Sequence, residues 1–303
     1  MGKQIAVFGL GKMGSQIARR LQKNGFEVLA WNRSEEPREE ASVAGVKTFA
    51  DINRLVKNMN DRPRVFWLML PHAIIDDFLK DHLGPQFKAG DIVIDGGNSF
   101  YKDSMRRAAG LRQKNISFYD CGTSGGVWGE KNGFALMVGG PKEQWGSVES
   151  IFKALSSGNN YGLVGKNGAG HFVKMVHNGI EYGMMEAIAE GYGIMKAADF
   201  NLDFKEVTRI YQQGTVIRGW LIDLTKNIFD TEDVEGTSGY IQQLGEGRWT
   251  ADAAKEFGVD ARVIEDSVKV RDESADPKNQ QKFSNKIVAL LRKQFGGHSV
   301  SKK

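Results

Sequence analysis

The sequence predicts a doubly wound α/β domain followed by an all-α domain built around one long helix. Three observations lead to this fold class. A short apolar run at the N-terminus is followed by a glycine motif, strand-sized and helix-sized segments alternate through the first half, and residues 168–196 contain no proline. A length of 303 residues suits two domains, since ~150 residues per domain is common. We expect one domain over residues 1–166 and the other over residues 167–303.

Short apolar runs bounded by turn residues indicate the strands of the first domain, and runs of this kind are typical of buried parallel strands. They occupy residues 4–8, 27–31, 65–70, 91–95, 116–121, 134–138 and 161–164. A helix is predicted over residues 13–24, between the first two strands. Such alternation predicts a sheet with helices on both faces.

The second half of the chain shows helical periodicity and no strong strand signal. Residues 168–196 read as one helix, which would be ~45 Å long at 1.5 Å per residue. Further helices are predicted over residues 204–211, 216–225, 249–257, 261–271 and 280–294.

Composition excludes several classes of protein. The net charge of +4 suits an anionic ligand, but no basic stripe with interleaved aromatic residues suggests a nucleic-acid partner. We interpret the densest basic cluster as a solvated helix face; its members are Arg106, Arg107, Arg112 and Lys114. No apolar stretch approaches the ~20 residues that cross a membrane, so no membrane partner is expected. No spacing of His, Cys or carboxylate residues suggests a required metal.

One cysteine, Cys121, excludes an intrachain disulfide and fits a reducing compartment. The N-terminal strand leaves no room for a signal peptide. We therefore expect a cytoplasmic protein.

Residues 9–14 form a G-x-G-x-x-G motif between a buried strand and a helix, as a Rossmann-type dinucleotide site requires. Its members are Gly9, Leu10, Gly11, Lys12, Met13 and Gly14. Gly9 permits the tight turn, Gly11 lets the backbone approach the pyrophosphate, and Gly14 lets helix and strand pack closely. The helix N-terminus then offers amide donors to the phosphates.

The end of the second strand bears on the choice of dinucleotide. An NAD site usually places an acidic residue there to hold the ribose 2′-hydroxyl. This chain has Asn32, Arg33 and Ser34 instead, and a guanidinium can pair with a 2′-phosphate. The sequence therefore favours NADP, while residues 35–36, both glutamate, leave NAD possible.

Four polar residues on the long helix are spaced i, i+3, i+4, i+7, and so share one face. They are Lys174, His177, Asn178 and Glu181. A lysine and a glutamate held two turns apart on a largely apolar helix can divide base and acid work. The alternative is the wet face of an amphipathic helix. Four glycines at positions 179, 183, 191 and 193 argue against it, since each costs ~1 kcal/mol in a helix interior and suggests tight packing.

The segment 171–183, HFVKMVHNGIEYG, is similar to the signature helix of 6-phosphogluconate dehydrogenases. The resemblance covers nearly the whole chain and includes DGGNS at 95–99, SGG at 124–126, GRWT at 247–250 and FGGH at 295–298. The length matches the short form of that family, which lacks part of the helical domain.

The resemblance implies oxidative decarboxylation of 6-phosphogluconate to ribulose 5-phosphate in the pentose phosphate pathway. Lys174 would be the general base at the C3 hydroxyl, and Glu181 would protonate C1 of the enediol. The residues implied to hold the carboxylate and hydroxyls are Asn98, Ser124, Gly125, Gly126, His177 and Asn178. Those implied to face the phosphate are Tyr182, Arg248, Thr250 and Arg271. Leu70, at a strand end near the nicotinamide, and Asn98 would also contact the cofactor, whereas His72 is interpreted as structural.

Arg292 and His298 match tail residues that in the family reach a neighbouring subunit, which implies a homo-oligomer, a dimer or tetramer. Alone, the 295–298 motif would suggest a frayed terminus. Arg248 stands where the long form has a lysine, which keeps the charge with a different geometry, and the segment before it, 236–247, matches the family loosely.

Two other functions remain open. One is a β-hydroxy acid dehydrogenase for an unphosphorylated acid such as 3-hydroxyisobutyrate, which would not need Glu181, His177 or the Arg292/His298 tail in this form. The other is a non-catalytic NADP-binding module, against which an intact Lys174 and Glu181 argue.

Overall fold

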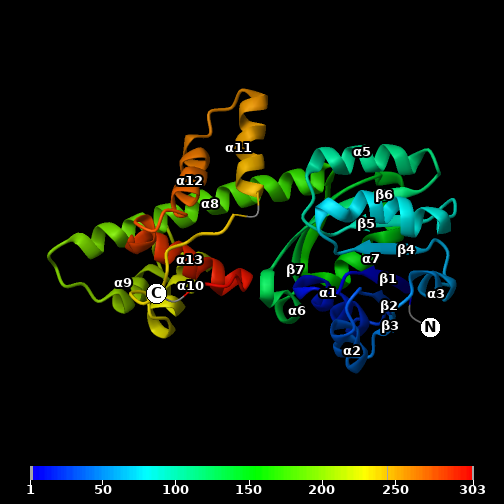
Figure 1. The fold of residues 1–303 in the computed structure, drawn as a ribbon, viewed down its shortest axis with the longest axis horizontal. Helices are drawn as coiled ribbons and strands as arrows, with labels where there is room; N and C mark the ends of the chain where they lie inside the picture. The colour runs from blue at the N-terminus through cyan, green and yellow to red at the C-terminus, as the bar shows by residue number, and fades with distance from the viewer. Residues whose placement is uncertain (1–2, 244, 302–303) are drawn as a thin grey trace. The chain divides into compact units, whose positions relative to one another are not determined.

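A computed structural model describes residues 3–243 and 245–301, which form two compact units along the chain. The first unit extends to Lys174 and the second begins at Met175 (Figure 1). The predicted boundary between residues 166 and 167 falls in the connection between the last strand and the long helix.

Strands and helices alternate through the first unit. The strands are β1 Gln4–Phe8, β2 Glu27–Trp31, β3 Lys47–Phe49, β4 Val65–Leu68, β5 Ile92–Asp95, β6 Ser117–Ser124, β7 Phe134–Gly139 and β8 Ser156–Gly165. The helices are α1 Lys12–Lys23, α2 Glu36–Val43, α3 Ile52–Lys57, α4 Ile75–Asp77, α5 Tyr101–Arg112, α6 Gly129–Asn132 and α7 Trp145–Leu155. This confirms the predicted α/β class.

The eight strands form one sheet in the order β3-β2-β1-β4-β5-β6-β7-β8. The strand order reverses between β1 and β4, and in open α/β sheets ligands bind beyond the carboxyl ends of the strands at such a switch point. All neighbouring strands are parallel except β6 and β7, which are antiparallel. The sequence predicted a parallel pattern for β7; instead the short turn around α6 returns the chain beside β6, and only a longer crossover makes a parallel pair.

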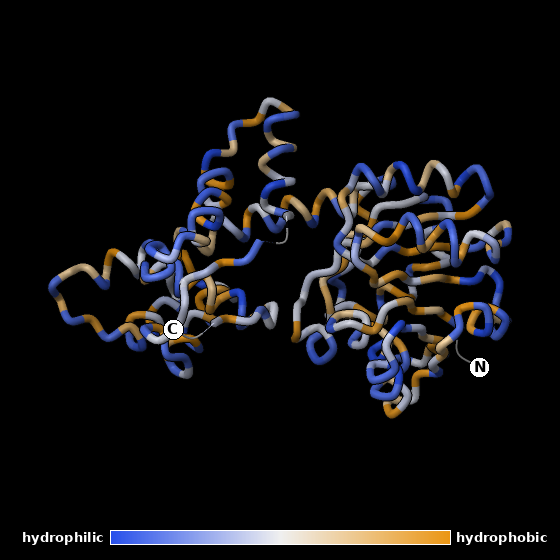
Figure 2. Tube along the Cα trace, viewed as in Figure 1, coloured by the Kyte–Doolittle hydropathy of each residue, from blue (hydrophilic) through white to orange (hydrophobic). Residues whose placement is uncertain are grey.

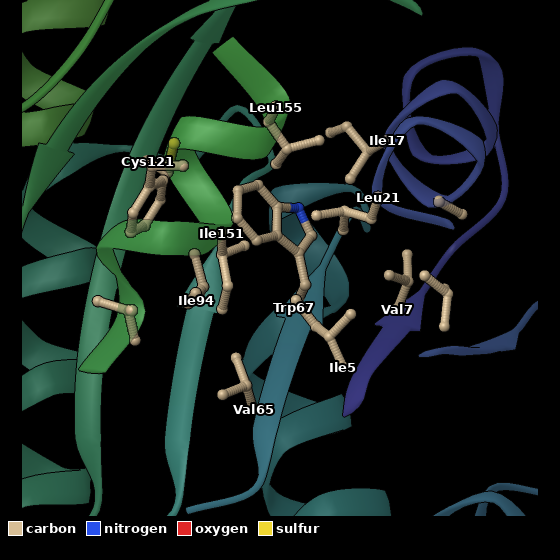
Figure 3. Close-up of a cluster of buried hydrophobic side chains, with 14 of the residues drawn as sticks. Ile5, Val7, Ile17, Leu21, Val65, Trp67, Ile94, Cys121, Ile151 and Leu155 are labelled. Carbon is tan, nitrogen blue, oxygen red and sulfur yellow. The ribbon is translucent and has the colours of Figure 1, made fainter. Parts of the chain in front are cut away.

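Two apolar clusters cover the two faces of this sheet. Along β1 the side chains alternate, so that Ile5 and Val7 join one cluster and Phe8 the other. Trp67 lies at the centre of the first cluster, among side chains of α1 and α7 (Figure 3). It is fully buried, and truncating such a side chain to alanine costs about 3–5 kcal/mol. Figure 2 shows the hydrophobic residues running along the strands, while the surface helices alternate in hydropathy.

The second unit is helical. Its elements are most of α8 Ala169–Ala197, then α9 Phe204–Tyr211, α10 Trp220–Thr231, α11 Glu246–Phe257, α12 Arg262–Glu273 and α13 Phe283–Gly296. The 29-residue α8 confirms the predicted long helix. Its buried side chains, Met185 and Ala189 among them, pack against α10, α12 and α13. No helix in the described part of the chain is long and apolar enough to cross a membrane.

Several predicted element bounds were wrong, among them the strand predicted from residue 161, which begins at Ser156, and the helix predicted from residue 249, which begins at Glu246. The helix predicted from residue 216 begins at Trp220, because its N-cap Gly219 is extended, with φ of 163° and ψ of 176°. The strand predicted to residue 70 ends at Leu68, where the chain turns toward Leu70.

Candidate active site and cofactor loop

The glycine motif forms a tight loop at the switch point of the sheet. Gly9 has a φ of 97°, and a Cβ added there would overlap Met69 O, beyond the end of β4. A Cβ at Gly14 would overlap Gly9 O, whereas one at Gly11 would meet no atom of the described chain within 4 Å. Gly11 is also the N-cap of α1, and α1 has no acidic residue in its first turn. Open space at Gly11 and a helix N-terminus with no side-chain cap and no acidic residue in its first turn fit the pyrophosphate of a dinucleotide.

The loop after β2 is tied to the glycine motif by Asn32. Its side-chain Oδ1 accepts a hydrogen bond from Leu10 N at 2.9 Å, and its Nδ2 donates to Ser34 O. Arg38 Nη1 donates to the carbonyls of residues 32, 33 and 34 at 2.7, 3.1 and 3.1 Å. Arg33 and Ser34 are exposed. Asn32 therefore holds the loop, and two guanidinium groups lie around it. Arg38 was not predicted, because its contacts depend on the turn between β2 and α2.

The structure brings Leu70 and the turn that carries Asn98 together at the ends of β4 and β5. A Cβ at Gly97 would lie 2.9 Å from Leu70 O, so the two turns are in close contact. Asp95 fixes the second turn, since its Oδ1 accepts from Gly97 N at 3.2 Å and its Oδ2 from Ser99 Oγ at 2.7 Å. Asn98 itself is exposed at the tip of this turn.

The glycines of residues 124–126 form a second turn, at the end of β6. Gly125 and Gly126 have φ values of 141° and 54°, in the left-handed region that glycine tolerates. Glu130, just beyond, accepts bidentate hydrogen bonds from Arg19 of α1. The turn that carries Ser124 is therefore anchored to the helix that follows the cofactor loop.

The first turn of α8 packs directly on β6 and β7. A Cβ at Gly170 would overlap Asp120 O, and one at Gly122 would overlap Cβ of Lys174. Lys174 therefore lies against Gly122 of β6, and Gly122 precedes Ser124 by two residues. Asp120 caps the helix, because its carboxylate accepts from Gly168 N at 2.6 Å and from His171 N at 3.0 Å. Burial raises the pKa of this carboxyl group.

Beyond Lys174, α8 continues without interruption and presents the other predicted polar residues. His177 Nδ1 lies 3.1 Å from Asn178 Oδ1 and 3.9 Å from Glu181 Oε2. All three side chains are half-buried. Lys174 and Glu181 are seven residues apart on the helix, a rise of ~10 Å.

Two buried arginines lie in the electrostatic surroundings of Tyr182 in the second unit, and Arg271 faces its ring. Cζ of Arg271 lies 3.1 Å from the ring centroid, and its Nε lies 3.9 Å from Oε1 of Glu186. Among the described residues, Nε and Nη2 of Arg271 and Oε1 of Glu186 have no hydrogen-bond partner. Burial lowers the pKa of Arg271, and burial together with the charge of Arg271 lowers that of Arg292 to about 10.

Arg292 thus lies in the electrostatic field of Arg271 of the same chain. Two desolvated cations, one of which has unsatisfied donors, attract an anion. The predicted contact of Arg292 with a neighbouring subunit stays a prediction.

The N-terminal part of α11 holds Tyr182 from another side. A Cβ at Gly247 would overlap the Tyr182 ring. Thr250 Oγ1 lies 2.7 Å from Met175 O and 2.9 Å from Glu246 O. Its single proton is therefore donated to a backbone carbonyl. Arg248 is half-exposed and its Nη2 donates to both carboxylate oxygens of Asp272 at 2.8 and 2.6 Å. Within the loosely matching segment 236–247, Leu244 lies outside the described residues.

One interpretation of the sequence was wrong. Arg107 does not belong to a solvated face, because its side chain is 2% exposed and pairs with Asp76 and Asp95. Its neighbour Arg106 is exposed, as predicted. His72 is exposed and its carbonyl accepts from Arg107. In the described part of the chain, no group of three His, Cys or carboxylate residues is placed to hold a metal ion.

Sequence reasoning missed three further residues of the site region. Asp120 caps the helix that carries Lys174, Glu186 pairs with Arg271, and Arg107 supports the Asn98 turn. The signal for Asp120 was a charged residue inside an otherwise apolar strand. The other two required knowledge of which helices meet.

The fold and the glycine loop define a dinucleotide-binding oxidoreductase with a helical second unit. Residues 4–165 match the family model described as the NAD binding domain of 6-phosphogluconate dehydrogenase, and residues 170–301 match the model of its C-terminal domain. The chain belongs to the 6-phosphogluconate dehydrogenase family.

Curated relatives and solved structures agree with this assignment. An enzyme of Haloferax volcanii named 6-phosphogluconate dehydrogenase, NAD(+)-dependent, decarboxylating, is 36% identical over 99% of both chains. The human decarboxylating 6-phosphogluconate dehydrogenase is 35% identical over 98% of this chain and 65% of its own length. The Plasmodium falciparum enzyme, solved in its apo form and with NADP+ or 6-phosphogluconate, is 30% identical and matches 89% of this chain and 62% of its own with a TM-score of 0.83.

Proteins with other names share this fold. A Mycobacterium tuberculosis 3-hydroxyisobutyrate dehydrogenase, 21% identical, covers 96% of this chain and 99% of its own with a TM-score of 0.76. At that identity the likeness concerns the fold alone.

Proposed function

We propose that this enzyme oxidises 6-phosphogluconate at C3 and decarboxylates it to ribulose 5-phosphate, with NADP preferred over NAD. One observation carries the proposal: α8 presents Lys174, His177, Asn178 and Glu181 on one face, and its first turn is fastened to β6 beside Ser124. Family membership supports the same substrate, although one relative is named for NAD+ and a structural neighbour was solved with NADP+.

The cofactor would be held by residues 9–14, by the loop of residues 32–34 and by Leu70. When bound, the dinucleotide supplies a hydride acceptor for C3. The N-terminus of α1 binds the pyrophosphate, and Gly11 leaves room for it. Arg33, with Arg38 beneath the same loop, pairs with a 2′-phosphate, which is the basis for preferring NADP.

Lys174 takes the proton of the C3 hydroxyl as the hydride departs. The resulting β-keto acid loses carbon dioxide, because the C3 carbonyl accepts the electron pair of the breaking bond. Lys174, now protonated, donates to the enolate oxygen that forms there. Glu181 then protonates C1 of the enediol, which gives the ketose. A positioned acid or base of this kind contributes about 10²–10⁴-fold to rate.

The remaining predicted residues bind and orient the substrate. Asn98, the 124–126 turn, His177 and Asn178 donate to its carboxylate and hydroxyls. Arg271 and Arg292 bind the phosphate, because both guanidinium groups are desolvated and Arg271 has two nitrogens without a hydrogen-bond partner among the described residues. Arg248 already pairs with Asp272, so we propose that it contributes less to phosphate binding, through long-range electrostatic attraction.

A homo-oligomer in the cytoplasm, with the tail around His298 reaching a neighbouring subunit, completes the proposal. An apolar stripe on α8 supports association, since Ile180, Met184 and Ile194 are more than half exposed at heptad-like spacing. The buried, unpaired Cys121 suits a reducing compartment.

The test is a panel of initial rates with NADP and NAD, each with 6-phosphogluconate and with 3-hydroxyisobutyrate. We expect turnover with 6-phosphogluconate alone and a higher kcat/KM with NADP. Turnover of 3-hydroxyisobutyrate, without that of 6-phosphogluconate, would instead establish the unphosphorylated-acid alternative.

Lys174→Met provides the mutational arm of the same panel. We expect kcat to fall about 10³-fold or more while NADP affinity stays within about twofold, because the base is removed and the cofactor loop is not touched. Lys166→Met, at an exposed lysine before α8, is the matched control and should keep parental rates. Equal rates for the two variants would exclude Lys174 as the base.

A further inference from the structure

Arg107 on α5 is a buried cation that contacts two separate turns, one after the carboxyl end of β4 and one after that of β5. Its Nη2 donates to His72 O, in the turn after β4, at 3.3 Å. Its Nη1 donates to Ser99 Oγ at 3.2 Å and lies 3.4 Å from Asp95 Oδ2, both in the turn after β5. Its Nε donates to Asp76 Oδ1 at 2.8 Å. One side chain thus connects both turns to α4.

The turn after β5 is fixed at its start by Gly96, whose N donates to Leu68 O at 2.9 Å and whose O accepts from Thr123 Oγ1 at 3.4 Å. Residues 96 and 97 are glycines, which carry no side chain, and Gly97 must approach Leu70 O closely. Its shape rests on hydrogen bonds from Gly97 N and Ser99 Oγ to the carboxylate of Asp95. Asp95 is fully buried, and a buried carboxylate is costly unless it is paired. Arg107 is the cation paired with it.

The charges around Arg107 hold its guanidinium in place. Burial alone would raise the pKa of Asp76, but hydrogen bonds from Arg107 and Arg106 lower it to about 2. Asp76 therefore stays ionised and anchors the outer edge of the guanidinium. A lysine could not replace this arrangement, because a guanidinium presents five donors in a planar fork and an ammonium is a point charge.

We infer that Arg107 is a positioning residue that fixes the Asn98 turn against the cofactor-side turn at Leu70. It contacts neither reacting atoms nor cofactor in this role, and acts through Ser99, Asp95 and the His72 carbonyl. The inference rests on the proposed function, which assigns these two turns to substrate and cofactor. A displacement of about 1 Å far from the chemistry can cost 10²-fold in rate, so a loosened turn has a measurable effect.

Arg107→Lys and Arg106→Lys form a matched pair, since both arginines bind Asp76 but only Arg107 reaches the turns. We expect kcat/KM for 6-phosphogluconate to fall about 30-fold in Arg107→Lys, mainly through kcat, and to stay within about twofold in Arg106→Lys. Arg107→Lys should also weaken NADP binding about fivefold, measured by fluorescence without substrate.

A double-mutant cycle with Asn98→Ala separates positioning from general stability. If Arg107 acts through Asn98, adding Arg107→Lys to Asn98→Ala costs less than about threefold further in kcat/KM. Equal losses in the two backgrounds would overturn the inference, as would an Arg107→Lys enzyme with parental kinetics. If Arg107→Lys does not fold, Ser99→Ala, which removes one of its contacts, should show the same non-additivity with Asn98→Ala, and additive losses there would overturn the inference equally.

Failure of the proposed function gives a different result. If the parent protein does not turn over 6-phosphogluconate, this substrate is excluded. The inference about Arg107 is then tested by NADP affinity alone. Unchanged NADP affinity in Arg107→Lys would then overturn it.

Discussion

The two units use buried arginines in opposite ways. In the first unit, Arg64 donates to both oxygens of Asp91 and to a backbone carbonyl, and Arg107 is bound on every side. In the second unit, Arg271 is equally buried, yet two of its nitrogens have no hydrogen-bond partner among the described residues. Its acidic neighbour Glu186 lies 3.9 Å away, too far for a hydrogen bond.

This difference separates structural from functional charge. A fully paired buried cation fixes the chain and has no donor left for a ligand. An underpaired one is costly to bury, and the cost is recovered when an anion arrives. We therefore propose that the arginines of the first unit fix the chain, and that Arg271 of the second unit binds the phosphate of the proposed substrate.

The largest effect expected from this comparison is on the stability of an Arg64→Met variant. It leaves Asp91 buried and unpaired, which costs about 3–5 kcal/mol. Urea unfolding measures this loss, and the folded fraction should keep a parental kcat/KM. A cost below about 1 kcal/mol would mean that the pair is not structural.

The corresponding change in the second unit should affect binding instead. Arg271→Met should lower kcat/KM for 6-phosphogluconate by about 10²–10³-fold, because the loss of one partner of a buried charged contact costs 2–5 kcal/mol or more. Its melting temperature should be unchanged or higher, since the unsatisfied donors are removed. A variant that loses stability and keeps its kcat/KM would reverse the assignment of the two regions.

The titration of Glu186 tests the same difference between the two units, through the pH dependence of stability. Burial raises its pKa to about 7, with Arg271 opposing and Glu190 adding to the shift. The folded state then binds a proton that the unfolded state has lost between about pH 4.5 and 7, so stability falls as pH rises through this window, by up to about 3 kcal/mol. Glu186→Gln should flatten that part of the stability profile in thermal melts from pH 5 to 8. An identical slope in both proteins would contradict the burial of an underpaired acid.

The smallest effect concerns the exposed arginine of the cofactor loop. Arg33→Ala should weaken NADP binding about tenfold and leave NAD binding within about twofold, because only NADP carries the 2′-phosphate. Binding titrations with both dinucleotides measure the ratio. Equal losses would assign Arg33 to the shared adenosine part, and NAD would then be the expected cofactor.

The sequence predicted the elements whose signal is local. The strand β1, the loop of residues 9–14 and the helix α8 follow from apolar runs, glycine spacing and the lack of proline over nearly thirty residues. It also placed Lys174 and Glu181 on one helix face, because helical spacing alone determines this.

The rest depended on tertiary contacts. Arg107 stands in a basic, helix-forming segment like its neighbours, and only the packing of α5 against the ends of β4 and β5 buries it. The antiparallel pairing of β7 with β6 and the pairing of Arg248 with Asp272 are tertiary contacts, and no local sequence pattern predicts them. Asp120 was visible as a charge in an apolar strand, but its role required the start of α8 above it.

The measurement that tests the central claim most directly follows NADP reduction and carbon dioxide release in the same sample, with 6-phosphogluconate as substrate. We expect one carbon dioxide for each reduced cofactor, with ribulose 5-phosphate as the product. Reduction without carbon dioxide would contradict the decarboxylation, and no reaction by folded protein that binds NADP would contradict the substrate.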